Sequence, residues 1–255
     1  MTWSAGMYLQ FAAERNRPVH DLLARVMTNP VSRAIDLGSG PGNSTEILLA
    51  AFPDAHVTGM DSSPEMIAAA RDRLPDIDFT LDDIATWVAP GWFDLILANA
   101  AIQWVPSHAT LLPRLMAKLR PGGSLAVQVP DNLTEATHRL MRQVAEEGPW
   151  SDRLLPAFAP WENRLDADRY YRILMPVAQS VDLWRTTYFH RLPSPAGIVE
   201  WFRSSTLRGF FALLTADEIV AFEARYQELI EAAYPPLPDG SVLLPFPRLF
   251  FVARR

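Results

Sequence analysis

The sequence predicts an α/β protein whose first half forms a parallel sheet covered by helices. Short apolar runs alternate with helix-length segments from residue 33 to 129. That alternation is typical of βαβ units with right-handed crossovers. A glycine loop follows the first apolar run and opens the next helical segment. Hydrophobic residues make up 49% of the 255 residues, which is ample for a core.

Five strands are expected in this half, each bounded by turn residues, at 33–37, 56–60, 77–81, 93–98 and 124–129. The helices expected between them cover 44–51, 62–73 and 107–119. Ser62 is the expected cap of the second helix, with Pro64 in its first turn and Glu65 completing a capping box.

The pattern changes after Pro130. We expect helices at 132–148 and over most of 196–234, a long strand at 181–190 and a closing strand at 248–253. The second half therefore adds two strands and two helical insertions, 131–178 and 194–240. We expect one domain over residues 1–255, in which 30–130 form the ligand-binding core and the insertions form a lid.

Composition excludes several classes of protein. The net charge of −6 disfavours binding to nucleic acid. The absence of cysteine excludes disulfides, thiolate metal sites and a cysteine nucleophile, and the five scattered histidines lack metal-ligand spacing. No apolar stretch approaches 18 residues, and no targeting signal is evident. We expect a cytoplasmic monomer that binds neither a metal nor a membrane.

The glycine loop is the strongest signal of function. Gly38, Gly40 and Gly42 would let the backbone turn sharply and approach a ligand. Asp61 lies 19 residues after Gly42, at the end of the next strand, where a carboxylate can accept both hydroxyls of a ribose. Asp36 would repel a pyrophosphate but suits an ammonium or sulfonium group. A nucleoside-containing, positively charged cofactor is implied, which disfavours a nicotinamide-dependent dehydrogenase.

Five segments, taken together, resemble the ordered motifs of class I S-adenosylmethionine-dependent methyltransferases. They are Asp36-Leu-Gly-Ser-Gly-Pro-Gly42, Gly59-Met-Asp-Ser62, Leu81-Asp-Asp-Ile-Ala85, Phe93-Asp-Leu-Ile-Leu-Ala-Asn99 and Leu119-Arg-Pro-Gly-Gly123. The resemblance implies a Rossmann-like sheet of seven strands, the last antiparallel, with helices on both faces. It also implies S-adenosylmethionine as cofactor and S-adenosylhomocysteine as product.

The resemblance assigns roles along the cofactor. The glycines would line the methionine end, Asp61 would bind the ribose, and Asp83 would hold the adenine amino group, with Asp82 as the alternative. The expected cofactor-binding residues are Tyr8, Phe11, Asp36, Gly38, Ser39, Gly40, Gly42, Asp61, Ser62, Asp83, Ile84 and Asn99. For Tyr8 and Phe11, which would fold over the cofactor, a purely structural role in the core is the alternative.

A narrower resemblance is to the family of bacterial trans-aconitate methyltransferases. The segments that carry it are 8–18, 99–105, 128–132 and 198–208. It implies esterification of one carboxylate of trans-aconitate, or of a close small polycarboxylate, by direct in-line transfer. The alternative is a class I methyltransferase acting on another small metabolite at oxygen, nitrogen or carbon.

A carboxylate nucleophile needs no general base, so we expect residues that position the substrate and no catalytic base. Gln103 and Trp104 follow the fourth strand, where open α/β sheets bind ligands. The expected substrate-binding residues are Gln103, Trp104, Tyr171, Trp201 and Arg208, of which Gln103, Trp104 and Arg208 would position the reacting groups. Trp201 could instead be a core residue, and Arg208 could be a charge favoured at a helix C-terminus.

Overall fold

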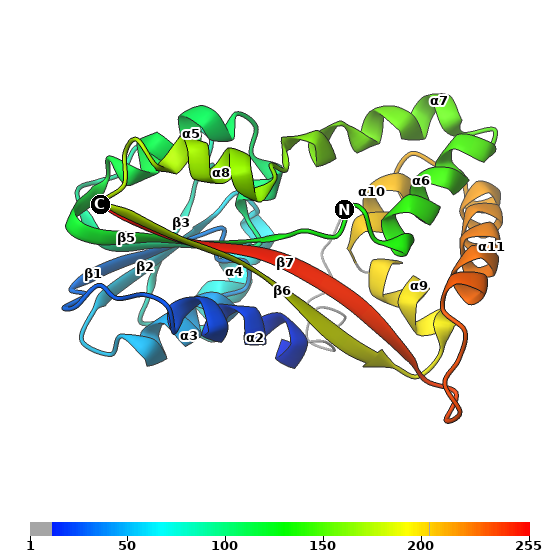
Figure 1. Ribbon diagram of the computed structural model, residues 1–255, viewed down its shortest axis with the longest axis horizontal. Coiled ribbons are helices and arrows are strands. Elements are labelled where there is room, and N and C mark those ends of the chain that lie inside the picture. Colours follow the sequence, from blue (N-terminus) through cyan, green and yellow to red (C-terminus); the bar gives the residue numbers. More distant parts are fainter. Residues whose placement is uncertain (1–11, 204) are drawn as a thin grey trace. The chain divides into compact units, whose positions relative to one another are not determined.

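The computed structural model of the protein describes residues 12–203 and 205–255 (Figure 1). Tyr8 and Phe11 lie outside the described residues. The strands form one sheet in the order β3-β2-β1-β4-β5-β7-β6. Their bounds are β1 Arg33–Leu37, β2 His56–Asp61, β3 Asp78–Leu81, β4 Phe93–Asn99, β5 Leu119–Pro130, β6 Ser180–Leu192 and β7 Val242–Arg254. The predicted seven-stranded sheet is confirmed.

Strands β1 to β5 run parallel to one another. The end of β7 lies beside the start of β5, because Gly122 and Gly123 exchange hydrogen bonds with Arg255. Strand β7 is therefore antiparallel, as expected. Strand β4 lies in the middle of the order and is buried along almost its whole length, which explains the apolar run from Leu95 to Ala98.

Helices cover both faces of the parallel part of the sheet. Figure 1 shows α2 (Ala12–Leu23), α3 (Asn43–Ala51) and α4 (Pro64–Arg73) on one face, and α5 (His108–Met116) and α8 (Ala167–Leu174) on the other. A 3₁₀ turn, η1 (Ile102–Trp104), connects β4 to α5. This arrangement leaves the carboxyl ends of β1 to β4 at one edge of the sheet.

Several helix boundaries differ from expectation, and those of α4 and α5 have clear physical reasons. Ser63, not Ser62, caps α4, because the Ser63 hydroxyl accepts the amide of Met66 and Pro64 takes the first helical position. Helix α5 ends at Met116, and β5 already begins at Leu119, which pairs with Phe93. The pairing is irregular between Phe93 and Leu95, beside Gly123, where an added Cβ would lie only 3.0 Å from the carbonyl oxygen of Asp94.

The last strand begins at Val242, six residues before the expected start. The sequence pattern did not predict this extension because it contains Pro245 and Pro247, and proline cannot donate a hydrogen bond to a neighbouring strand. The carbonyl of Pro247 still accepts the amide of Asp131 at 2.9 Å. A proline on an accepting position is therefore compatible with the strand.

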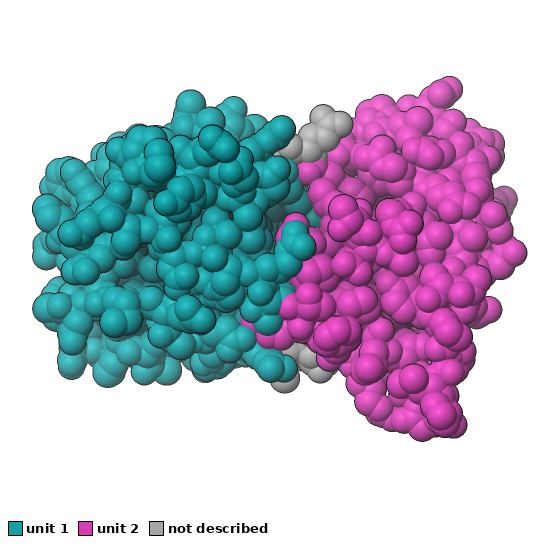
Figure 2. All heavy atoms as spheres, in the orientation of Figure 1, with its two compact units in different colours: residues 1–130, 163–186, 249–255 teal, residues 131–162, 187–248 magenta. Residues whose placement is uncertain are grey.

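The chain divides into two compact units, coloured separately in Figure 2. Unit 1 comprises residues up to 130 together with 163–186 and 249–255, and it includes α8. Unit 2 comprises 131–162 and 187–248. Its elements are α6 Ala136–Glu147, α7 Ser151–Leu154, η2 Leu155–Asn163, α9 Pro195–Arg203, α10 Thr206–Phe211 and α11 Ala216–Ala233.

Unit 2 has an aromatic core of its own. Helix α11 packs against α6 and α9. Phe222 of α11 is fully buried and contacts Trp150 and Phe210, and the hydroxyl of Tyr226 donates to the carbonyl of Thr137 at 3.2 Å. Within the described part of either unit, no helix has the length and apolar character needed to cross a membrane.

Candidate functional site

Four segments meet at the carboxyl edge of the parallel sheet in unit 1. Asp36 lies at the end of β1, Asp61 closes β2, Asp82 follows β3 and Asn99 closes β4. The strands are in register there, with Leu37 opposite Met60 and Asp61 opposite Leu81. Polar side chains that are distant in sequence are thereby gathered where such sheets bind their ligands.

The glycine loop is held by the neighbouring strand. The amides of Gly38 and Ser39 both donate to the carbonyl of Met60, at 2.8 and 2.9 Å, and the amide of Gly40 donates to Oδ2 of Asp61 at 2.9 Å. Gly38, Gly40 and Gly42 have φ angles of 72°, 54° and 88°, which favour glycine. The loop is therefore fixed through its own backbone amides, by one carbonyl and one carboxylate of β2.

Gly38 and Gly40 are needed for different reasons. A Cβ on Gly38 would lie 2.4 Å from the Cβ of Ala101, so this position is closed by packing. A Cβ on Gly40 would meet no described atom within 4 Å. The backbone at Gly40 thus borders open space, and a ligand can approach it closely.

Asp36 is a buried carboxylate at the base of this loop. Its Oδ2 accepts the hydroxyls of Ser44 and Thr45 at 2.6 and 2.7 Å, while its buried Oδ1 has no hydrogen-bond partner among the described residues. Burial raises the pKa of Asp36 to about 6, and the two hydroxyls oppose that rise. The side chain of Ser39 is also buried without a partner among these residues.

Asp61 accepts one backbone amide on each oxygen, from Gly40 and from Ser63, both at 2.9 Å. It is half-buried, and each carboxylate oxygen retains capacity for a further donor. Two vicinal hydroxyls of a ribose match this capacity. Ser62, the next residue, is exposed.

The turn after β3 carries Asp82, Asp83 and Ile84. Oδ1 of Asp82 accepts the amide of Asp83 at 2.7 Å, and Oδ1 of Asp83 accepts the amide of Ala85 at 2.8 Å. Asp83 is exposed, Asp82 is half-buried and Ile84 is buried. Both carboxylates thus stabilise the turn through one oxygen, and each retains acceptor capacity in its other oxygen.

The segment after β4 carries further acceptors. Nε2 of Gln103 donates to the carbonyl of Ala100 at 2.7 Å, and Ala100 has a positive φ of 51°. Oδ1 of Asn99 and Oε1 of Gln103 are buried and have no partner among the described residues. Trp104 is 59% exposed, which is unusual for tryptophan. This segment therefore presents both polar and aromatic groups beside the glycine loop's strand.

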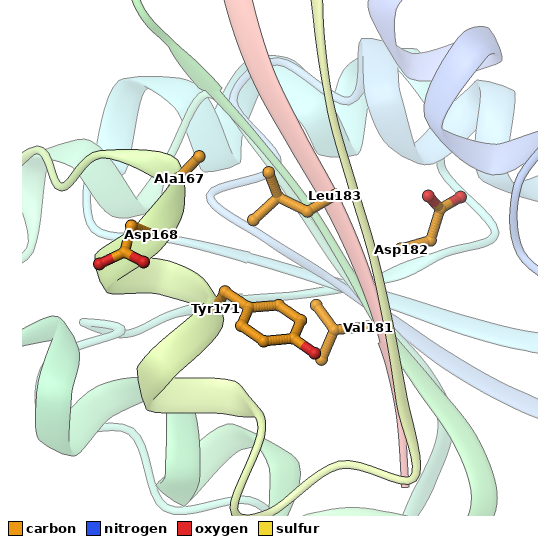
Figure 3. A pocket seen from close by; sticks show the side chains of 6 residues that line it. All are labelled: Ala167, Asp168, Tyr171, Val181, Asp182 and Leu183. Carbon is orange, nitrogen blue, oxygen red and sulfur yellow. The ribbon is translucent and has the colours of Figure 1, made fainter.

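Tyr171 is not brought to this edge. It lies on α8 in an open groove of about 450 Å³ that Asp168 and Asp182 also line, and its ring lies beside Val181 (Figure 3). The groove is at the start of β6, where Gln179 bonds the end of β7. That is the amino end of the parallel strands, opposite the glycine loop.

Trp201 and Arg208 belong to unit 2. Trp201 is buried and stacks on His190 with a centroid distance of 4.7 Å, which places its ring in an aromatic cluster. Arg208, on α10, is half-buried and forms no ion pair within the described part of the chain.

Several supporting residues escaped the sequence analysis. Ser44 and Thr45 hold Asp36, and a hydroxyl pair in the first turn of the helix after the loop was an available signal. Arg114 bonds the turn after β3, and His108 bonds Tyr170, 62 residues away. No local pattern indicates these contacts, because they depend on tertiary packing.

Known proteins are similar to this chain both in the region of the glycine loop and over its full length. A family model described as a methyltransferase domain matches residues 34–123. The chain is 52% identical to a trans-aconitate 2-methyltransferase of Methylobacterium nodulans, covering 99% of this chain and 98% of that one. It is 48% identical to a protein of the same name from Variovorax paradoxus, covering 100% and 99%.

Solved structures show the same fold at low sequence identity. The YcgJ protein from Bacillus subtilis aligns with a TM-score of 0.60 and 11% identity, covering 94% of this chain and 98% of that one. A Haemonchus contortus phosphoethanolamine N-methyltransferase, solved with S-adenosylmethionine, aligns with a TM-score of 0.57 and 16% identity, covering 94% and 52%. With full-length identities near one half to the first group, the chain belongs to the trans-aconitate 2-methyltransferase family of class I S-adenosylmethionine-dependent methyltransferases.

Proposed function

We propose that the protein transfers the methyl group of S-adenosylmethionine to one carboxylate of trans-aconitate. The carboxylate oxygen forms a bond to the methyl carbon as the carbon–sulfur bond breaks, and the electron pair of that bond stays on sulfur. The products are a monomethyl ester and S-adenosylhomocysteine. The observation that carries the proposal is the 52% identity over 99% of the chain, because it includes unit 2 as well as the methyltransferase core.

The residues at the carboxyl edge fit this cofactor. Asp36 offers a buried anionic oxygen without a partner among the described residues, which suits the methionine ammonium. Asp61 retains acceptor capacity for both ribose hydroxyls, and Gly40 borders open space for the ligand. We assign the adenine amino group to Asp83, which is more exposed than Asp82. We place the adenine ring beside the side chain of Ile84.

The further cofactor contacts of the proposal are Ser39 and Gly38 along the methionine and the backbone carbonyl of Asn99 beside the ammonium. Ser62 is exposed and follows Asp61, the proposed ribose-binding carboxylate, so we keep it among the proposed cofactor contacts. When bound, S-adenosylmethionine supplies the electrophilic methyl group. The protein's part is to hold the donor in one orientation and keep water away.

The substrate side rests on charge and exposure. Arg208 is half-buried without an ion pair among the described residues, so a substrate carboxylate is its proposed partner. Gln103 and Trp104 supply an amide and an aromatic face after β4. Trp201 is assigned to the aromatic core of unit 2, and Tyr171, at the opposite edge of the sheet, is left out of the proposed site.

The test is methyl transfer from labelled S-adenosylmethionine to a panel of di- and tricarboxylates that includes trans-aconitate. Label transferred to trans-aconitate and released as methanol by mild base is the expected result, because esters hydrolyse in base and ethers and methylamines do not. Cofactor binding without transfer to any acid would overturn the carboxylate assignment. In that case amines, phenols and carbon nucleophiles would be tested with the same label.

A further inference from the structure

Helix α5 touches the backbone of both loops that follow β3 and β4. Near the end of the helix, Nη1 of Arg114 donates to the carbonyl of Ala85 at 2.8 Å, and its Nη2 donates to the carbonyl of Ile84 at 2.6 Å. At its first residue, Nε2 of His108 lies 2.7 Å from the carbonyl of Ile102. One helix thus holds the proposed adenine turn at one end and the Gln103 segment at the other.

Arg114 bridges two consecutive carbonyls, which requires the planar fork of a guanidinium group. The amides of Thr86 and Trp87 bond the carbonyl of Asp83 from within the turn, at 3.0 and 2.7 Å. The turn is therefore fixed internally by Asp83 and externally by Arg114. Without the external bonds, its orientation relative to the sheet would rest on the buried side chains of Ile84 and Trp87 and on the bond from the amide of Asp82 to the carbonyl of Asp61.

His108 is held in one state by its surroundings. Its Nδ1 lies 3.0 Å from the hydroxyl of Tyr170, and both residues are buried, at 3% and 0% exposure. Since the carbonyl of Ile102 can only accept, Nε2 carries the proton and Nδ1 accepts the tyrosine hydroxyl. Burial also lowers the pKa of His108, which keeps the ring neutral.

The helix that joins these two contacts is rigidly packed. Leu111, Leu112 and Leu115 are buried in the core between the sheet and the helices. Helix α5 packs against β5 and α8, and α8 carries Tyr170. Displacement of either end would therefore disturb a close-packed core, which resists it.

We propose that α5 is the positioning element of the site, with Arg114 setting cofactor affinity through the turn after β3 and His108, with Tyr170, setting substrate alignment through the segment after β4. This inference rests on the proposed roles of Asp83 and Gln103. Arg114 and His108 touch no reacting group and act only through the loops. Substitutions at the two ends of the helix should therefore have separable effects. Those at Arg114 should change cofactor affinity, and those at His108 should change kcat/KM for the methyl acceptor.

The first test measures binding of S-adenosylhomocysteine, which needs no methyl acceptor. Arg114→Ala is expected to weaken binding about 30-fold, since two hydrogen bonds to a charged group are lost. Millimolar guanidinium should restore much of the affinity by occupying the vacated place. Preference for the adenine over the hypoxanthine analogue should fall as well, because the turn that reads the amino group is no longer fixed.

Arg255 provides the matched control. Its guanidinium also bonds two carbonyls, those of Ala117 and Leu119, but at the amino end of β5. Arg255→Ala should leave affinity and base preference unchanged. Unchanged affinity in folded Arg114→Ala, or an equal loss in Arg255→Ala, would overturn the role of Arg114. Arg114→Lys, which keeps the charge without the fork, serves if the alanine variant does not fold.

The second test separates the other end of the helix. His108→Leu is expected to lower kcat/KM for the acceptor that the panel identifies by about 100-fold, as misplacement of a reacting group does, while S-adenosylhomocysteine affinity stays constant. His108→Gln should recover most of the loss, because its amide can donate to Ile102. Tyr170→Phe, the milder change, should lie between them.

Equal loss in His108→Leu and His108→Gln, or a parallel fall in cofactor affinity, would overturn the substrate-side role. Failure of trans-aconitate as acceptor would contradict the proposed function but not these binding measurements. Unchanged cofactor affinity in Asp83→Asn together with a loss in Arg114→Ala would show that Asp83 is misassigned while the turn still positions the cofactor.

Discussion

The amide of Gly40 donates a 2.9 Å hydrogen bond to Oδ2 of Asp61, so the glycine loop and the carboxylate at the end of β2 hold each other in place. The second oxygen of Asp61 is fixed by Ser63 at the start of α4. Two successive βα connections are therefore joined through a single side chain. Any change to Asp61 should act on loop geometry and on ribose binding together.

Asp61→Ala is expected to weaken S-adenosylmethionine binding at least 100-fold, because charge-assisted bonds to the loop and to the proposed ribose hydroxyls are lost together. Isothermal titration measures the change. Asp94→Ala is the matched control, since Oδ2 of Asp94 also accepts two backbone amides, from Ser32 and Arg33. That variant should lose stability but keep its affinity, and equal affinity losses would contradict the ribose assignment.

Gly40→Ala and Gly38→Ala should fail in different ways. At Gly40 the added methyl group meets no described atom, so the variant should fold at a cost of about 1 kcal/mol for its positive φ and bind the cofactor poorly. At Gly38 the methyl group would overlap Ala101, so the melting temperature itself should fall sharply. Thermal denaturation and cofactor titration of both variants separate these outcomes. A Gly40→Ala protein with normal affinity would place the ligand elsewhere.

Asp36 should make stability depend on pH between about 4 and 6. Its pKa is raised from 3.8 to about 6 in the folded protein, so the folded state holds the proton more tightly than the unfolded chain does. The stabilisation is fully present below pH 3.8 and is lost as the pH rises through 6, by about 3 kcal/mol. Urea denaturation of wild type and Asp36→Asn across this range isolates the effect. Parallel curves for the two proteins would contradict it.

Arg208→Ala should raise KM for trans-aconitate by about 10- to 100-fold, the value of one charge-assisted hydrogen bond, and leave cofactor affinity intact. Arg203→Ala on α9 is the control. Arg203 is exposed and already paired with Glu223 at 2.6 Å and Glu200 at 3.5 Å. Steady-state kinetics would compare KM for trans-aconitate in the wild type and both variants. An equal KM in the wild type and Arg208→Ala would remove Arg208 from the proposed substrate site.

The parallel strands were predictable because their sequence reports their burial. Strand β4 lies between β1 and β5 and is apolar from Leu95 to Ala98, with Asp94 near its start and Asn99 at its end, so no alternation of polar residues breaks its central run. The boundaries at Ser63 and Val242 were not predictable in the same way. Ser62 and Ser63 can both cap a helix, and only the backbone path selects one of them. The early start of β7 depends on which side of the strand faces a partner at Pro245 and Pro247.

The residues of the candidate site also differ in how far their positions could be predicted from the sequence. Asp36, Gly40 and Asp61 follow strands at fixed spacing, so the sequence alone brings them together. Trp201 and Tyr171 have the chemistry of substrate contacts, but one packs on His190 and the other lies at the far edge of the sheet. Residue type indicates what a side chain can bind, whereas its place in the fold depends on tertiary packing that no local pattern reports.

The division of the chain has a consequence for engineering. The backbone passes between the two units four times, at 130/131, 162/163, 186/187 and 248/249. Unit 2 therefore cannot be cut away by shortening either terminus. Replacement of unit 2 by that of a relative would require two segments, 131–162 and 187–248, to be transplanted together. A graft of one segment alone would separate α11 from α6, its packing partner, and should give insoluble protein.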